Sequence, residues 1–263
     1  FFDVAKAMAR VRNRTAEEVR RIPQVSVETD ISLMIVGGQL YARRGHPRFE
    51  HFEDKWVMMK SLLASVVANT CGDIPDVAFD MDLNSSGTNV TDLPVLAIAR
   101  KLDGLNNGGI LVPNPFFKGV NFWRMKMRLF WKVAELVPWK QRDDRVFWRG
   151  KLANHSEHAE GNVERVQAAM LSRKYPKVFD VRLANNRHRD FAVQRADYCR
   201  WKFLLNLPGS TLGSYSQNLN HLWNSGSLVM QWETTPRKGV RFEEWYYPAL
   251  ETNVTHVLIN NAD

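Results

Sequence analysis

Asp80 and Asp82 are the carboxylates whose spacing most directly suggests chemistry. The segment Val77–Leu83 alternates, which predicts a strand with both carboxylates on one face and apolar side chains on the other. Such a carboxylate can act as a general base, and a pair can hold a divalent ion against a diphosphate. The alternative is a solvated strand face without chemistry. The polar run 84–87 follows at the kind of strand end where sites form.

A second candidate site is the strand end formed by Arg149 and Gly150. The predicted strand Val146–Trp148 runs into this pair, and the helix that follows carries Arg165. A glycine turn before a helix N-terminus offers backbone N–H groups and a positive dipole end to a phosphate. No complete glycine-rich phosphate motif is present, so a purely structural turn remains the alternative.

The segment from Lys202 to Ser227 has the same order of strand, small-residue loop and helix. Its strand ends near Gly209, and Ser214 and Ser216 stand at the expected helix start. Hydroxyls and N–H groups in a first helical turn suit a diphosphate or a sugar. A glycine turn followed by a serine N-cap, with no ligand, accounts for the same pattern.

Histidines and tryptophans raise two further hypotheses, a metal site and a sugar-stacking surface. His155 and His158 lie near two glutamates but lack the spacing of one helical face, so we expect surface residues rather than a metal site. Four tryptophans are candidates for stacking on a sugar: Trp123, Trp131, Trp139 and Trp148. Their helical and strand spacing favours core packing instead.

These candidates require a scaffold in which strands alternate with helices. Residues 54–68 predict a helix, and residues 31–41 predict a hairpin around Gly37 and Gly38. Further strands are expected at 94–99, 109–112, 146–148, 178–183, 203–207, 228–232 and 254–259, and further helices at 122–136, 162–173 and 215–223. This alternation predicts α/β layers around a mostly parallel sheet. The charged segment 139–145 is the expected domain boundary.

The composition is that of a folded, basic protein. Of 263 residues, 44% are hydrophobic, and 36 Lys and Arg against 28 Asp and Glu give a net charge of +8. This excludes disordered, collagen-like and coiled-coil classes, and the length suits one large or two medium domains. Cys71 and Cys199 are too few for a disulfide-rich scaffold or a zinc site, which leaves one long-range disulfide or two free thiols.

The positive charge raises the hypothesis of nucleic-acid binding, because cationic surfaces bind phosphate backbones. The arginines occur in scattered pairs, such as Arg43 with Arg44 and Arg187 with Arg189. Neither an RNA-binding aromatic motif nor a recognition-helix pattern accompanies them. We therefore expect no nucleic-acid partner.

Glycosylation motifs and hydropathy bear on the compartment. Five Asn-x-Ser/Thr motifs, which favour a secretory lumen, begin at Asn13, Asn84, Asn89, Asn154 and Asn253. The longest uncharged stretch, 203–232, is broken by Pro and Gly, so we expect no membrane span within the chain. The sequence begins at Phe1 without a leader, so we expect that any targeting segment was removed or not included.

Several sequence motifs occur in the order found in a known family. They are Phe147-Trp148-Arg149-Gly150, Arg165, the run from Tyr198 to Gly209, Ser214-Tyr215-Ser216, Ser225-Gly226-Ser227-Leu228-Val229 and Phe242-Glu243-Glu244-Trp245-Tyr246-Tyr247-Pro248. Looser matches in the first half are Ile74-Pro75-Asp76-Val77, Pro94-Val95-Leu96 and Ile110-Leu111-Val112-Pro113. From about residue 73 to residue 259, the chain thereby resembles the capsule-associated-protein and protein O-glucosyltransferase family of the Rumi type.

The resemblance implies two Rossmann-like domains of the GT-B kind, with a UDP-glucose or UDP-xylose donor held mainly by the second. It also implies inverting transfer, in which a first-domain carboxylate deprotonates the acceptor hydroxyl and UDP leaves as an anion. The implied donor-site residues are Arg149, Gly150 and Arg165 at the diphosphate, Gly209, Ser214 and Ser216 in the donor loop, and Glu244 near the ribose or sugar.

Two departures from the family pattern bear on activity. Asn218 stands where the family has an arginine after the helix-start serines, which removes a cation from the diphosphate. In the first half, Ser85 and Ser86 stand where the family has an aspartate. Asp80 or Asp82, upstream of these serines, therefore becomes the candidate base.

The sequence thus predicts an α/β glycosyltransferase with two Rossmann-like, GT-B-like domains at residues 1–140 and 141–263, the second truncated at its C-terminus. Asp82 and Asp80 are the catalytic candidates, and Asn218 joins the donor-site residues. We expect a UDP-sugar donor, a protein or polysaccharide acceptor, no separate cofactor and no metal. The expected compartment is the lumen of the endoplasmic reticulum or Golgi, with any membrane anchor in a missing N-terminal segment. The alternative is a catalytically silent relative that binds glycans or partners.

Overall fold

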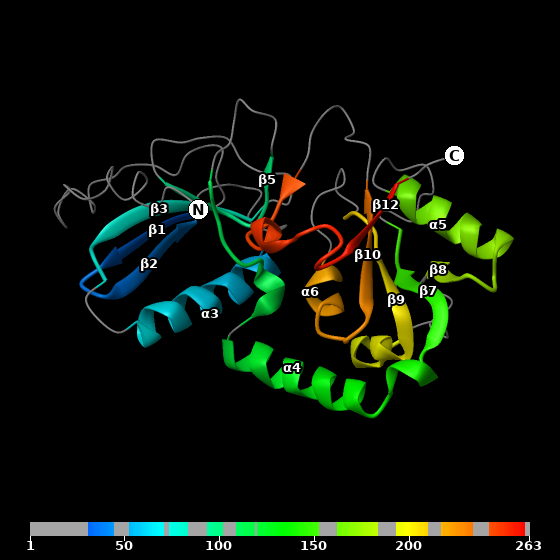
Figure 1. Cartoon of the computed structure of the whole chain (residues 1–263). Coiled ribbons are helices and arrows are strands. Elements are labelled where there is room, and N and C mark those ends of the chain that lie inside the picture. The colour runs from blue at the N-terminus through cyan, green and yellow to red at the C-terminus, as the bar shows by residue number, and fades with distance from the viewer. Residues whose placement is uncertain are drawn as a thin grey trace. The chain divides into compact units, whose positions relative to one another are not determined.

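The computed structural model describes ten stretches of the chain (Figure 1). They are residues 31–44, 53–70, 74–83, 94–101, 109–118, 120–152, 162–183, 193–209, 217–233 and 242–260. The chain forms two compact units, one of residues up to Phe122 with Phe242–Trp245 and one of Trp123–Arg241 with Tyr246–Asp263. The C-terminal part of the chain therefore contributes to both units.

The first unit is built on a five-stranded mixed sheet of order β2-β1-β3-β4-β6. Its strands are β1 (Ile31–Val36), β2 (Gln39–Arg44), β3 (Val77–Asp82), β4 (Val95–Ala97) and β6 (Ile110–Leu111). β1 is antiparallel to β2 and β3, whereas β3, β4 and β6 run parallel. Gly37 and Gly38 have φ of 55° and 70°, as a two-residue turn between twisted strands requires, so the predicted hairpin is confirmed.

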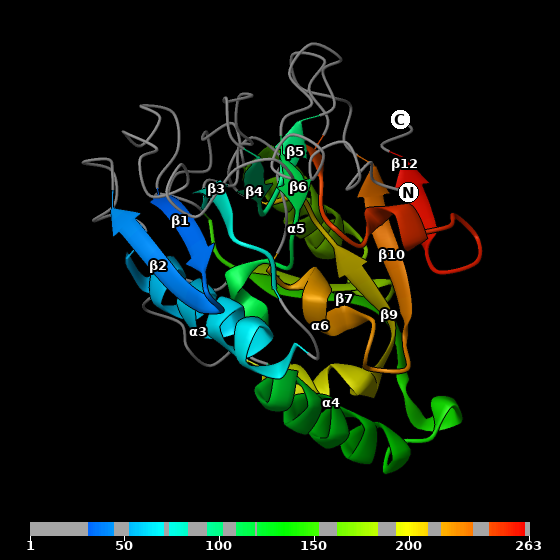
Figure 2. The ribbon, with the colours of Figure 1, turned by 90° about the vertical axis from the view of Figure 1, so that its left-hand side faces the viewer.

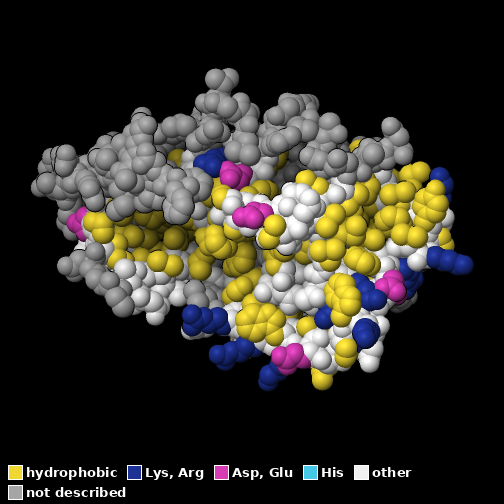
Figure 3. Space-filling model, in the orientation of Figure 1, with side chains coloured by type: hydrophobic (Ala, Val, Ile, Leu, Met, Phe, Trp, Pro, Cys, Tyr) yellow, Lys and Arg dark blue, Asp and Glu magenta, His cyan; other side chains and the backbone are white. Residues whose placement is uncertain are grey.

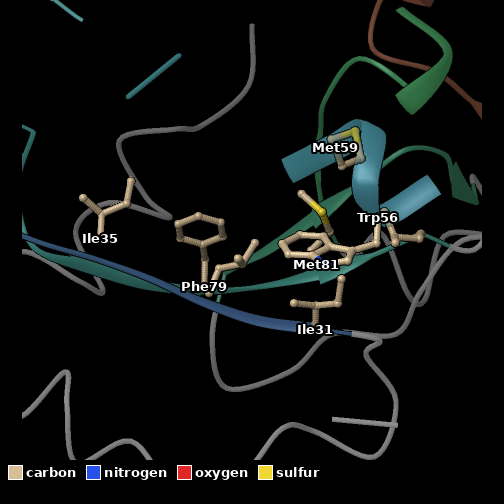
Figure 4. Packing of buried hydrophobic residues seen from close by; sticks show 8 residues of the cluster. Ile31, Ile35, Trp56, Met59, Phe79 and Met81 are labelled. Carbon is tan, nitrogen blue, oxygen red and sulfur yellow. The ribbon is translucent and has the colours of Figure 1, made fainter. Parts of the chain in front are cut away.

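Helix α3 (Glu53–Asn69) packs on one face of this sheet (Figure 4). Its buried residues Trp56 and Met59 belong to the same core cluster as Phe79 and Met81 of β3. The predicted alternation of β3 is confirmed, because its apolar residues join this core and its two aspartates point to the other face.

A two-stranded sheet that the sequence did not predict also belongs to the first unit. Strand β5 (Arg100–Lys101) pairs antiparallel with β11 (Phe242–Glu243). An ion pair between Arg100 and Glu243 joins the same two strands. A 3-10 helix, η2 (Pro115–Phe117), follows Asn114, whose side chain caps it by accepting a hydrogen bond from the Phe116 N–H.

The second unit contains a five-stranded, fully parallel sheet of order β12-β10-β9-β7-β8 (Figure 2). Its strands are β7 (Asp143–Gly150), β8 (Phe179–Leu183), β9 (Trp201–Asn206), β10 (Leu228–Glu233) and β12 (Val257–Asn260), and its helices include α5 (Val163–Lys174) and α6 (Leu219–Leu222). Numbered along the chain, the sheet order is 2-1-3-4-5, the order of flavodoxin-like doubly wound proteins.

Two hydrophobic cores cover the two faces of this parallel sheet. On one face, Ala168 and Ala169 of α5 pack with Trp148 and Leu205. On the other face, Phe147 belongs to a cluster with Tyr198 and with leucines of β9 and α6. Because both faces are covered, the strands are apolar on both sides, as is usual for parallel sheets.

Helix α4 (Val120–Glu135) and the 3-10 helix η3 (Trp139–Gln141) precede the parallel sheet. The buried guanidinium of Arg142 donates hydrogen bonds to the carbonyl oxygens of Val137, Ser225 and Gly226. It thereby ties the chain after α4 to the turn that precedes β10. Two further 3-10 helices, η7 (Arg195–Arg200) and η9 (Tyr247–Ala249), complete the described elements.

The predicted α/β fold with largely parallel sheets is confirmed. The helix expected at 215–223 is reduced to α6, with turns on either side, and residues 210–216 lie outside the described residues. The domain division at residue 140 and the C-terminal truncation stay predictions, while the compact units meet at residues 122 and 123 and share the segment after 241. None of the described helices is long and apolar enough to cross a bilayer.

Candidate functional site

The carboxyl ends of β7 and β9 form the switch point of the parallel sheet. β7 connects through α5 to β8 on one side, and β9 connects through α6 to β10 on the other. Connections that diverge in this way leave a crevice in which α/β proteins bind ligands. Gly150 ends β7 and Gly209 follows β9, so both predicted glycines lie at this edge.

Arg165, in the first turn of α5, bridges the two strand ends. Its Nη1 donates to the carbonyl oxygen of Lys151 after β7, and its Nη2 donates to that of Pro208 after β9, at 3.1 Å. Its Nε is buried and makes no hydrogen bond. Burial lowers the pKa of Arg165, opposed in part by the nearby Glu164 carboxylate. A guanidinium with an unused N–H at a switch point is suited to bind an anionic oxygen.

The packing of Trp148 explains why residue 150 is a glycine, without reference to a ligand. A Cβ at this position would lie 2.3 and 2.4 Å from two ring carbons of Trp148, which is buried. The glycine therefore leaves room for the indole that packs against α5. Gly209 is buried where the described stretch after β9 ends.

Arg149 lies at the predicted edge but is bound within the protein. Its Nη2 donates to Asp180 Oδ1 at 2.8 Å, and its Nη1 donates to the carbonyl oxygens of Trp148 and Asp180. Asp180 is buried and also lies 3.3 Å from the Nε of Arg182. Burial lowers the pKa of Arg149, and the Asp180 carboxylate opposes this shift. A role of Arg149 at a diphosphate stays a prediction, and its observed role is to pair Asp180.

Three polar side chains with an unpartnered buried atom stand side by side near the same strand ends. They are Arg149, Asn206 and Gln231, which lack partners at Nε, Oδ1 and Oε1, respectively. Gln231 pairs with Asn206 in the strand register, and alternation from Phe147 opposite Leu204 places Arg149 on the same face. Buried polar atoms are nearly always hydrogen-bonded, so this polar row indicates where a ligand or water completes the bonding.

Asn218 lies on the same face of the sheet, just before α6. Its backbone carbonyl oxygen accepts a hydrogen bond of 2.9 Å from the His221 N–H, and burial raises the pKa of the Tyr198 hydroxyl on the same face. His221, on α6, is buried, and its Nε2 lies 2.7 Å from Arg195 Nη1. Burial, then the cations Arg195 and Lys126, lower the pKa of His221 to about 2, so this ring is neutral. Asn218 therefore lies at the start of the short helix that carries buried His221, the residue that contacts Arg195.

Asp80 and Asp82 are buried in the first unit. Their exposed fractions are 2% and 3%, so the alternative of a solvated strand face is wrong. Asp80 Oδ1 accepts a hydrogen bond of 2.6 Å from the Ser32 hydroxyl, which fixes it on the neighbouring strand. Asp82 ends β3 at the carboxyl edge of the parallel strands of that sheet. Of the two, Asp82 has the position expected of a reacting group.

Glu244 belongs to the first unit, together with β11. It is 1% exposed, and its Oε2 accepts a hydrogen bond of 3.1 Å from the side chain of Asn114. The placement of Glu244 near a ribose or sugar stays a prediction. Its observed contact explains why the Asn114 side chain is held at the start of η2.

Several other candidates lie outside the described residues, namely Ser214, Ser216, His155, His158 and the run 84–87. Within the described part, no group of three His, Cys, Asp or Glu is arranged to hold a metal. Cys199 carries a buried, free thiol. The core interpretation is correct for Trp148, at 4% exposed, and wrong for Trp131 and Trp139, at 55% and 45%.

Asn206, Asp180 and Arg195 are polar residues of this region that the sequence analysis did not single out. Asp180 follows Phe179 in a strand whose residues alternate, and no spacing relates it to Arg149. Asn206 lies within the motif from Tyr198 to Gly209, and a polar residue at the end of an apolar strand is a usable signal. The parallel strands β8 and β9, far apart in sequence, bring Asp180 and Asn206 to either side of β7.

This arrangement, a doubly wound sheet with cationic and unpartnered polar groups at the switch point, is that of α/β proteins that bind ligands at the strand ends. The chain belongs to glycosyl transferase family 90, because the sequence profile of that family matches residues 10–263.

The chain is also similar to a protein named O-glucosyltransferase rumi, from Drosophila pseudoobscura pseudoobscura. The two are 25% identical over 155 residues, which is 55% of this chain and 34% of that protein. The match thus spans about a third of the length of that relative. The expected family resemblance is confirmed.

Proposed function

We propose that this protein transfers glucose or xylose from a UDP-sugar to a hydroxyl of a protein or glycan. Membership of glycosyl transferase family 90 and similarity to an O-glucosyltransferase support the transfer reaction. The observation that carries the proposal is Arg165, which bridges the ends of β7 and β9 with one buried N–H unused. We further propose a GT-B arrangement in which the unit with the parallel sheet binds the donor.

The diphosphate of the donor is proposed to lie at the switch point. Arg165 and the backbone N–H groups at the start of α5 present positive charge there, which stabilises UDP as it leaves. Gly150 and Gly209 keep the two strand ends free of side chains. The polar row of Arg149, Asn206 and Gln231 supplies one donor and two acceptors for the remaining groups of the nucleotide sugar. Ser214, Ser216 and Asn218 remain proposed donor-loop residues, and Glu244 a proposed sugar contact.

An inverting reaction is proposed, with Asp82 as the base and Asp80 as the alternative. The acceptor oxygen forms a bond to the anomeric carbon as the bond from that carbon to the phosphate oxygen breaks. The carboxylate takes the hydroxyl proton, and UDP carries away the electron pair. Because arginine and N–H groups stabilise the leaving anion, we propose that no metal is needed.

A secretory lumen is proposed as the site of action. The five Asn-x-Ser/Thr motifs support it, since they are modified only in that pathway. Asn253, the acceptor that lies within the described residues, is exposed.

Calorimetric titration of UDP and of uridine, each with and without a chelator, tests the proposal. Arg165→Ala is expected to raise the Kd for UDP about 10- to 150-fold, the loss of one charged hydrogen bond, and to leave uridine affinity unchanged. Arg173→Ala, an exposed arginine at the other end of α5, is the control and should behave as the unchanged protein.

Three results would count against parts of this proposal. A chelator that abolishes UDP binding would contradict metal independence. Equal losses of affinity for UDP and uridine in Arg165→Ala would mean that Arg165 stabilises the conformation of the loops after β7 and β9 rather than binding the diphosphate. A folded protein that binds neither ligand would instead support the silent, partner-binding alternative, which the internal pairing of Arg149 also favours.

A further inference from the structure

Helix α4 has one apolar face that the second unit buries. Met127 and Phe130 are 5% and 3% exposed. Trp123 stacks on the ring of His221 at 5.3 Å, and Phe130 meets the same ring edge-on at 5.9 Å. Residues 123, 127 and 130 are separated by four and three positions, so they form a single helical stripe. This stripe accounts for the packing of α4 against α6.

A second apolar stripe on the same helix remains uncovered. Met125 and Leu129 are 64% and 54% exposed and lie one turn apart. Beyond the end of α4, Leu136 is 79% exposed, and Trp139 of η3 is 45% exposed with its ring edge-on to Phe203 at 6.4 Å. A helix of a monomeric globular protein needs only one apolar stripe for its core, so the second requires another explanation.

Cations line this uncovered stripe. Arg124, Arg128 and Lys132 are exposed and recur every four residues, and Glu135 is the only acidic side chain in α4. No ion pair among the described residues involves these three cations. In the space-filling view, basic and hydrophobic side chains lie together along the lower edge, where α4 runs (Figure 3).

We propose that the outer face of α4 binds the surface of an anionic phospholipid bilayer. A helix that exposes large apolar side chains beside unpaired Arg and Lys can insert the former between lipids and hold the latter at the phosphates. Each basic residue near such a surface contributes about 1 kcal/mol. The indole of Trp139 suits the headgroup level, where tryptophan is enriched. An acidic protein partner would need carboxylates opposite the cations and apolar side chains opposite Met125 and Leu129. Any part of an anionic bilayer offers both phosphates and acyl chains.

Vesicle co-sedimentation tests this binding. The full chain is mixed with vesicles of phosphatidylcholine alone or with about one-third phosphatidylserine, and the partition coefficient is measured. We expect binding to the anionic vesicles and little to the neutral ones. The double variant Arg128→Gln/Lys132→Gln should bind about 25-fold more weakly, because each lost charge removes about fivefold. Met125→Ser/Leu129→Ser should lose about tenfold or more, as two partly buried apolar side chains are removed.

Matched variants elsewhere serve as controls. Lys174→Gln/Lys177→Gln removes two exposed charges at the end of α5, and Val57→Ser/Val66→Ser removes two exposed apolar side chains on α3. Both should bind vesicles as the unchanged protein does. Circular dichroism and the Tm of each variant establish that the fold is retained, which is expected because every altered side chain is exposed.

Three results would overturn the proposal. One is equal partition onto neutral and anionic vesicles, and a second is equal loss in the control and α4 variants. The third is a dimer in solution that Met125→Ser/Leu129→Ser dissociates, which would assign the stripe to a second copy of this chain. None of these measurements depends on UDP binding, so the donor-site proposal stands or falls separately.

Discussion

Asp82 combines complete burial with a position at the end of a strand. A carboxylate that accepts the proton of an attacking hydroxyl contributes about 100- to 10,000-fold to a rate. We predict that Asp82→Asn lowers the turnover of UDP-glucose, with water or a protein as acceptor, by that factor and leaves UDP affinity unchanged. The measurement is UDP release together with calorimetry.

Asp80→Asn is the matched control, because Asp80 is bonded to Ser32 and lies inside β3. It should lower the Tm more than the turnover. If Asp80→Asn abolishes turnover and Asp82→Asn does not, the assignment of the base is reversed.

The pair of Arg149 with Asp180 is predicted to stabilise the fold. Arg149→Ala removes three hydrogen bonds from the guanidinium and leaves buried Asp180 to Arg182 and, more distantly, Arg145. We expect the free energy of unfolding to fall by about 2 kcal/mol, less than for a charge left wholly unpaired. Urea unfolding measures it, with Arg182→Ala, whose side chain is half exposed, as the milder comparison. Equal losses in the two variants would argue against a dominant Arg149–Asp180 pair.

For single residues, the sequence predicted which face of a strand a side chain occupies, but not which residues it contacts. Alternation correctly separated Asp80 and Asp82 from the apolar side of β3, because it depends on local geometry alone. It did not show that the opposite face is buried, or that Arg149 meets Asp180. Both depend on contacts between segments about 30 to 50 residues apart, and no local period records such contacts.

The contact between α4 and α6 is predicted to weaken in acid. His221 has a pKa lowered to about 2 by burial and by neighbouring cations, against 6.5 in an ordinary environment. Below pH 6.5 the unfolded chain binds a proton here and the folded one does not. The contribution of neutral His221 to the free energy of unfolding is therefore full above pH 6.5. It is lost as the pH falls towards 2, by up to about 1.4 kcal/mol per pH unit.

Comparison with His221→Gln isolates this effect. Between about pH 7 and pH 5, the stability advantage of the unchanged protein over this variant should shrink by about 2 kcal/mol in urea unfolding. Phe130→Leu disturbs the same packing without a titrating group, so its deficit should not vary with pH. A pH-independent deficit for His221→Gln would contradict the prediction.

The helices and strands with clear local periods were predictable, and the short or nonlocal ones were not. α3 and the β1–β2 hairpin agree with expectation because apolar spacing and a two-glycine turn determine them. β5 and β11 have two residues each, too few for any period, and pair across more than 140 positions of sequence. α6 is shorter than predicted, since polar Asn and Gln precede it and its burial comes from tertiary packing.

At the scale of the whole molecule, the chain passes between the two compact units more than once. The segment Phe242–Trp245 joins the first unit although it follows the last residues of β10. Local composition does not reveal such a return to the first unit, and the domain division at residue 140 stays a prediction. The candidate residue Glu244 is consequently in the first unit.

Passage through a secretory compartment predicts a glycan at Asn253. This residue is exposed and has φ of 64°, a conformation that asparagine adopts readily. Expressed through that pathway, Asn253→Gly should lack one glycan that the unchanged protein carries, because glycine retains the backbone conformation without the acceptor. Mass spectrometry before and after glycosidase treatment measures this.

Thr255→Ser is the matching control, since it keeps both the motif and a hydroxyl able to bond to Glu251. It should retain the glycan. Equal masses for the unchanged protein and Asn253→Gly would show that the site is not used.

The position of α4 at the amino-terminal ends of β7, β9 and β10 has an electrical consequence. β7 has eight residues and therefore spans about 26 Å. Its amino-terminal end lies near α4, and its carboxyl-terminal end lies beside Arg165 (Figures 1 and 2). Mobile ions reduce the field of an exposed charge over about 8 Å at physiological ionic strength. The cations of α4 and Arg165 are thus insulated from each other, so the two can change independently, and the energetic effects of substitutions in both should simply add.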